Sequence, residues 1–235
     1  WPLDLESYGV SAREKLTTRS GHPLLILSDR IALVFGFADH ELYVHRLRGR
    51  GVVSELTEPV TVLVPQAALE LGEPAQAFLL ARAFAAASLR ASLVDKLTPR
   101  ELEVFVASSL RHLSAGFGSG LTSEDVLDDQ SRRIQKALSR KARRTLEENA
   151  ARYIGAPPVD FNAFARNVAL GTARAALLCA DDLVLAVEVL RRTERDMGTL
   201  DPATLVRTVP LVTELVRFWA SDAALATRRR LAVIA

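Results

Sequence analysis

The hydrophobic pattern of this chain changes character at Pro65, and that change limits the folds that the chain can adopt. Residues 24–64 hold short runs rich in β-branched and aromatic side chains, which are LLIL, IALVFGF, ELYVHRL, GVVSEL and VTVLV. After Pro65, apolar residues recur at helical spacing, and alanine and leucine become frequent. The sequence therefore predicts an α+β fold, with a small N-terminal antiparallel sheet in residues 1–64 and a mostly α-helical bundle in residues 65–235.

Residues that favour helix starts divide the second part into about seven or eight helices. These starts lie at Pro65, Thr98, Ser123, Asp160, Asp182, Asp201-Pro202 and Asp222. The helix from Asp160 to about Ala180 is mostly small and apolar, so we expect it to be central and buried. No low-complexity linker and no repeat period separates these segments, which favours a single domain over residues 1–235.

Composition narrows the class of protein. An apolar fraction of 49% and a charged fraction of 25% are ordinary for a soluble globular protein, and a net charge of +2 gives no argument for nucleic acid. The lone Cys179 allows no internal disulfide, so we expect a reducing compartment such as the bacterial cytoplasm. Arginines interrupt the longest apolar stretches, so we expect no membrane span. The chain opens on Trp1 without an initiator methionine, and we expect a fragment of a longer protein.

Local motifs do not indicate a metal, a cofactor or a catalytic nucleophile. His40 and His45 frame a stretch that resembles the H-E-x-x-H zinc motif, but their spacing of five puts the two rings on different faces of either a helix or a strand. The glycine-rich residues 116–120 follow a helix and lack the Gly-Lys-Ser/Thr continuation of a phosphate loop, so they predict a connector between helices. No Ser/His or Cys/His pair is joined by a recognisable spacing.

The most charged stretch is SRRIQKALSRKARR, residues 131–144, which contains no acid. Its cations are Arg132, Arg133, Lys136, Arg140, Lys141, Arg143 and Arg144. It is preceded by four acids, which are Glu124, Asp125, Asp128 and Asp129, so one helical segment would have an acidic beginning and a basic end, as the helix dipole favours. Two interpretations stay open, a solvated helix face and a binding surface for nucleic acid or an acidic partner, and we favour the first.

Residues 97–105, LTPRELEVF, resemble the start of the DNA-binding domain of LuxR-like response regulators. In that family a second helix follows closely, whereas the similar stretch here begins only at Leu121, beyond the glycine-rich connector. Asp128 and Asp129 would also bring acids toward DNA phosphates. We therefore interpret the stretch as a helix start in which Thr98 and Glu101 form a capping box.

A second resemblance covers more of the chain. Residues 60–65, VTVLVP, followed by QAALELGEPAQAFLLARAFAAAS, are similar to the strand and zinc-binding helix of gluzincin metallopeptidases of the HtpX and CAAX-prenyl-protease type. Residues 169–182, ALGTARAALLCADD, are similar to the helix that carries their third ligand, with Arg174, Leu177 and Cys179 in matching places. The resemblance implies a zincin-like bundle, of the divergent kind found beside tetratricopeptide repeats in large bacterial proteins.

The zinc chemistry of that family does not carry over to this chain. The positions that match its two histidines, its general base, its third ligand and its supporting aspartate are Arg82, Ala86, Ala83, Ala169 and Ala173. The resemblance therefore implies a pseudoenzyme without metal or catalytic residues, in which the helices of Arg82 and Ala169 face each other.

On this basis the sequence favours a non-catalytic protein-interaction or scaffold domain. Its partner would be another protein or other domains of the same longer chain. Two alternatives stay open. One is a DNA-binding transcriptional regulator, and the other is an enzyme whose residues meet only in space.

Overall fold

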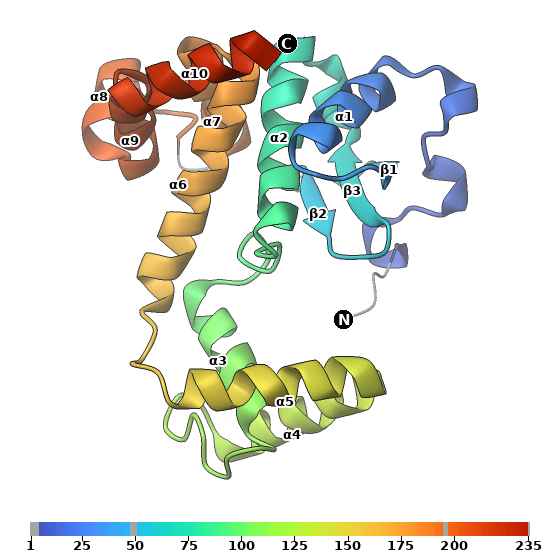
Figure 1. Cartoon of the computed structure of the whole chain (residues 1–235), viewed down its shortest axis with the longest axis vertical. Coiled ribbons are helices and arrows are strands. Elements are labelled where there is room, and N and C mark those ends of the chain that lie inside the picture. Colours follow the sequence, from blue (N-terminus) through green and yellow to red (C-terminus); the bar gives the residue numbers. More distant parts are fainter. Residues whose placement is uncertain (1–4, 48–50, 195–196, 235) are drawn as a thin grey trace. The chain divides into compact units, whose positions relative to one another are not determined.

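A computed structural model describes residues 5–47, 51–194 and 197–234 of the chain (Figure 1). The chain forms two compact units. We call Leu93–Arg166 the inserted unit, and we call the described part of Leu3–Ser92 and Asn167–Ala235 the main unit. The sequence predicted one domain and did not indicate this division, because neither junction lies in a stretch with the composition of a linker.

The N-terminal part of the main unit contains one helix and a three-stranded sheet. Its elements are the 3₁₀ turns η1 (Glu6–Tyr8), η2 (Ala12–Glu14) and η3 (Thr18–Ser20), the helix α1 (Pro23–Val34), the strands β1 (His40–His45), β2 (Val53–Glu55) and β3 (Val60–Pro65), and the 3₁₀ turn η4 (Gln66–Glu70). With the helical region that follows, this sheet confirms the α+β class.

The sheet is mixed, so the expectation of an antiparallel sheet is wrong in its strand directions. The strand order is β1-β3-β2, with β1 parallel to β3 and β2 antiparallel to it. Because β2 occupies one edge of β3, β1 pairs along the other edge, where His40 lies opposite Val60. All but the last residue of β3 are buried, which explains its continuous apolar run in the sequence.

The predicted strands in LLIL and IALVFGF are also wrong, because LLIL and the first four residues of IALVFGF lie in α1. The ring nitrogen Nδ1 of His22 accepts a hydrogen bond from the backbone N–H of Leu24 at 3.1 Å, and Pro23 occupies the first helical position. Leu24, Leu27 and Ile31 fall on the buried side of this helix. Apolar residues also cover much of its exposed side, so the helical period was hidden in the sequence.

The core of the main unit includes α2 (Glu73–Ser88), whose Phe78 and Phe84 are fully buried. The helix α2 packs on α1 and on α7. The C-terminal helices are α6 (Phe161–Ala180), α7 (Leu183–Thr193), α8 (Pro202–Thr208), α9 (Pro210–Trp219) and α10 (Asp222–Ile234). No helix among the described residues is long and apolar enough to cross a membrane.

The helix α6 is only partly central, contrary to the expectation from its composition. Its buried residues, which are Thr172, Ala173, Ala176 and Leu177, all lie in the second half of the helix. Phe164 in the first half is exposed. Small and apolar residues predicted burial of the whole helix, but only its second half contains buried residues.

The inserted unit contains α3 (Pro99–Leu110), α4 (Glu124–Ala137), α5 (Arg140–Ile154) and the beginning of α6, with α3 packed on α4. The expected single helix through residues 124–144 is wrong, because the chain becomes extended at Leu138. Ser139 then starts a new helix by accepting a hydrogen bond from the backbone N–H of Ala142 at 3.2 Å.

Candidate functional sites

The positions that match the zinc motif lie on α2 and α6 and serve packing. Ala83 and Ala86 are buried on α2, and Ala173 is fully buried on α6, whereas Ala169 is partly exposed. The guanidinium of Arg82 lies 3.1 Å from the carboxylate of Glu194, in the segment that follows α7. The structure therefore gives Arg82 an ion-pair partner on a different segment from the one that the resemblance implies.

These positions do not fit a zinc ion. Methyl groups offer no ligand, and the guanidinium of Arg82 stays charged and cannot donate an electron pair. Among the described residues, no group of three or more His, Cys, Asp or Glu side chains comes close enough to hold a metal. Burial raises the pKa of the Cys179 thiol, so this side chain packs as a protonated, small apolar group.

Arginines join the C-terminal helices of the main unit. Arg174, which matches an arginine of the family motif, forms an ion pair with Glu214 and lies over the ring of Phe218, with 5.5 Å from its guanidinium carbon to the ring centroid. The guanidinium of Arg228 lies 3.8 Å from the ring centroid of Trp219. Both contacts stack a cation on an aromatic ring, and they connect α6 and α10 to α9.

A serine, a histidine and an aspartate meet between α1 and β1, and sequence reasoning missed this group. The hydroxyl of Ser28 lies 2.7 Å from Nε2 of His40, and Nδ1 of His40 lies 3.8 Å from the carboxylate of Asp29. The His40 ring packs edge-to-face with Phe84, with 5.1 Å between ring centroids and an angle of 88° between the ring planes. The sequence did not indicate this pair, because Ser28 lies between two predicted strands, LLIL and IALVFGF, whereas the structure places it on the buried side of a helix.

The chemistry of this group is limited by its burial. Burial lowers the pKa of His40, although Asp29 and Asp39 oppose that shift, so the ring is neutral at pH 7. The hydroxyl of Ser28 is fully buried, and the gap between His40 and Asp29 is too long for a hydrogen bond. The geometry therefore satisfies two polar groups in the core and presents no exposed nucleophile.

Arg111 links the end of α3 to α4 and to the connector between them. Its guanidinium forms ion pairs with Glu124 and Asp128 of α4 and donates to the carbonyl of Phe117 at 3.2 Å. An open cavity of about 380 Å³ lies beside it. The wall of this cavity is made by Arg111, His112, Asp125, Asp128, Ser131 and Arg132. Because its two arginines and two aspartates balance in charge, the cavity offers no clear preference for an anion or a cation.

The start of α3 has the predicted capping box. The hydroxyl of Thr98 accepts from the backbone N–H of Glu101 at 3.2 Å, and the Glu101 carboxylate accepts from the backbone N–H of Thr98 at 2.7 Å. The glycine-rich residues 116–120 form turns between α3 and α4, as expected of a connector. LTPRELEVF is therefore accounted for by local hydrogen bonding.

The helix break divides the predicted basic surface between α4 and α5, and all seven cations are exposed. Arg132 and Arg133 form ion pairs with Asp129, and Arg144 forms one with Glu148. The guanidinium of Arg143 donates to the backbone carbonyl of Gln135 at 2.8 Å.

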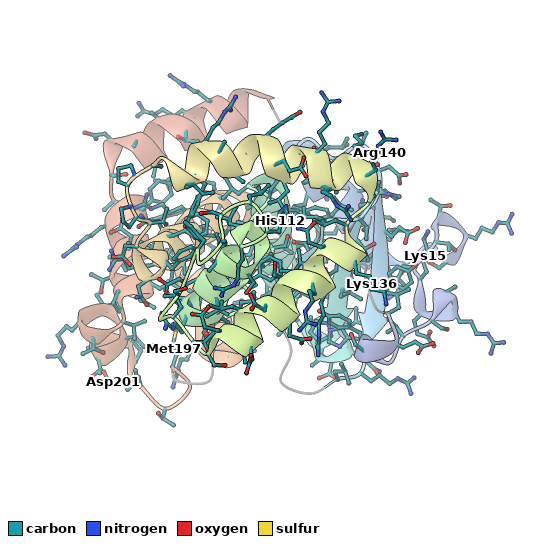
Figure 2. All side chains as sticks on the ribbon, turned by 90° about the horizontal axis from the view of Figure 1, so that it is seen from below. Lys15, His112, Lys136, Arg140, Met197 and Asp201 are labelled. Atoms are coloured by element: carbon teal, nitrogen blue, oxygen red, sulfur yellow. The ribbon has the colours of Figure 1, made fainter. Side chains whose placement is uncertain are left out.

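The other three cations, Lys136, Arg140 and Lys141, have no carboxylate partner within the described part of the chain. Figure 2 shows Lys136 and Arg140 at the same end of the α4–α5 pair. The structure therefore brings the unpaired cations together at the turn between the two helices.

Comparisons of the chain with models of protein families, with curated proteins and with solved structures gave no match. The resemblance to gluzincin metallopeptidases therefore stays a prediction from the sequence.

Proposed function

We propose that this chain is a non-catalytic protein-interaction domain whose fold derives from a metallopeptidase-like ancestor. The observation that supports the proposal is the use made of α2. On this helix the positions matched to the zinc motif are packed alanines, and the one polar residue among them, Arg82, is neutralised by Glu194. A helix that would carry a catalytic centre instead contributes a core, which is compatible with a fold kept for binding.

The proposal is tested by two measurements on the purified chain, one of bound zinc and one of hydrolytic activity. Elemental analysis of the purified chain after dialysis against a chelator should find no stoichiometric zinc. Hydrolysis of casein and of a simple ester should not exceed the rate of a Ser28→Ala variant, which removes the hydroxyl beside the ring nitrogen of His40. One retained zinc per chain, or hydrolysis that disappears with Ser28, would show that the domain is an enzyme.

A further inference from the structure

The helix break at Leu138 changes the electrostatic environment of the basic segment. In one continuous helix, the cations after Ala137 would lie near a helix C-terminus, where the dipole stabilises positive charge. In the structure, Arg140 and Lys141 are instead the first two residues of α5, and its first turn contains no acid. These cations therefore lie where the helix dipole disfavours them, and dipole matching does not explain their position.

Local neutralisation separates the seven cations into two groups. Arg132, Arg133 and Arg144 are paired with carboxylates of their own helices. We call the second group the basic turn, which consists of Lys136, Arg140, Lys141 and Arg143. Arg143 bonds to a carbonyl of α4 and so retains its full positive charge, while the other three have no acid partner among the described residues.

We propose that the basic turn binds a short acidic segment of a partner protein, rich in aspartate or glutamate. This inference rests on the proposed function and names the partner's chemistry. Exposed, like-charged side chains gathered at one turn repel one another, and an acidic segment removes that repulsion while forming charge-assisted hydrogen bonds. The arginines of the turn can each bind a carboxylate through two N–H groups.

The surroundings of the basic turn favour an acidic peptide over a nucleic acid. On α5 the next helical turn carries Glu147 and Glu148, and on α4 the preceding turns carry Asp125, Asp128 and Asp129. A nucleic-acid duplex has phosphates at regular, close intervals over its whole length, so it would bring phosphates against these acids. A short peptide can end before it reaches them.

The test is a binding titration of the full chain with a fluorescent decaglutamate peptide at physiological salt, with decaglutamine as the uncharged control. The turn variant carries Lys136→Gln, Arg140→Gln and Lys141→Gln. Its matched control carries Arg132→Gln, Arg133→Gln and Arg144→Gln, which removes the same number of charges from the same helices. We expect the turn variant to bind decaglutamate at least about tenfold more weakly than the native chain, and the control variant to lose less than about threefold.

Equal losses in the two variants would overturn the proposal, because binding would then follow net charge alone. Absence of decaglutamate binding by the native chain would overturn it as well. A duplex DNA or a single-stranded RNA that binds more tightly than decaglutamate, and that weakens in the turn variant, would replace the acidic protein by a nucleic acid.

Two further measurements keep these outcomes separate from folding and from the proposed function. Thermal melting should show that the turn variant is no less stable than the native chain, because it removes repulsion at the start of α5. If the triple variant does not fold, the three single substitutions are compared instead, and Arg140→Lys, which keeps the charge, should preserve binding. Zinc content and hydrolysis are measured on the native chain, so failure of the basic turn leaves the non-catalytic proposal to be judged on its own result.

Discussion

At the scale of single residues, side chains of the same kind have different roles because their neighbours differ. Arg111 is almost buried between two carboxylates and a carbonyl, whereas Arg140 is exposed without an acid partner among the described residues. His40 has a buried ring bonded to Ser28, whereas His22 uses its ring nitrogen to cap α1. The amino-acid composition does not distinguish these residues. Only their contacts show which side chains are engaged within the fold and which are exposed to a binding partner.

The buried His40 predicts that acid destabilises the main unit. Burial lowers the pKa of His40 below the value of 6.5 that the ring has when exposed, so the unfolded chain binds a proton more readily than the folded chain. The stabilising contribution is complete above the unfolded pKa and is lost as the pH falls through that value toward the folded pKa. Denaturant unfolding at several pH values measures this effect. Between about pH 7.5 and pH 5, the free energy of unfolding should fall less in a His40→Gln variant, which has no ring to protonate, than in the native chain. Equal losses in the two proteins would mean that His40 is not the responsible group.

Gly118 predicts a second, purely steric effect. Its φ is +78°, and a Cβ atom built there would lie 2.5 Å from Cβ of Ala107 on α3. Gly120 has a φ of +88° and no atom within 4 Å of such a Cβ, so it serves as a control for backbone strain alone. We expect Gly118→Ala to lower the free energy of unfolding by about 2 kcal/mol or more, and Gly120→Ala by about 1 kcal/mol. Similar urea midpoints for the two variants would show that α3 does not approach the connector so closely.

At the scale of elements, the start and end of each helix decide what its charges do. Ser139 begins α5 in the middle of a basic run, so the same cations that would end one helix favourably begin another unfavourably. Asp182 and Asp201 instead place carboxylates at the starts of α7 and α8, where they accept backbone N–H groups. The charge pattern at the start of α5 therefore differs from that at the starts of α7 and α8.

The two ends of α5 predict substitutions of opposite effect. Arg140→Gln removes a cation from the first turn of α5 and should raise the free energy of unfolding by about 0.5 kcal/mol. Arg152→Gln removes a cation from the last turn of the same helix and should lower it by about the same amount. Chemical denaturation at low salt measures both changes, and added salt should reduce both. Changes of the same sign would contradict a separate α5.

At the scale of the whole molecule, contacts between distant segments define the two units. In the main unit, the sheet and α1 come from the N-terminal part of the chain, and α7 to α10 come from its C-terminal part. The packing of α7 on α2 leaves the cation of Arg82 beside Glu194, although the two residues are 112 positions apart in the chain. In the inserted unit, Arg111 at the end of α3 forms ion pairs with Glu124 and Asp128 of α4.

The pair of Arg82 and Glu194 predicts a measurable coupling across the main unit. A double-mutant cycle of Arg82→Ala and Glu194→Ala should give a coupling of about 0.5 kcal/mol, small because the Glu194 carboxylate is partly exposed to water. The metallopeptidase resemblance predicts a different coupling, between Arg82 and a glutamate introduced by Ala169→Glu. If the second cycle shows the larger coupling, Arg82 faces α6 and the resemblance gains support. If only the first cycle shows a coupling, Arg82 contacts the segment after α7 and not α6.

The sequence by itself determined the features that depend on residues three or four positions apart. The capping box of Thr98 and Glu101, the helix starts at Asp182 and Asp201, and the helical character of the second part could be predicted. The physical reason is that a cap satisfies backbone N–H groups within its own turn, so all of its partners lie in one short stretch.

Only the tertiary structure decided which distant segments meet. The apolar residues of α1 fit a strand or a helix equally well, and only the burial of Leu24, Leu27 and Ile31 in the core selects the helix. The direction of β1 is set only by its pairing along β3. Burial of a side chain and the pairing of strands are free energies of contact between segments that a local pattern does not identify. For the same reason, the bond between Ser28 and His40 and the gathering of unpaired cations at the basic turn became visible only in the folded chain.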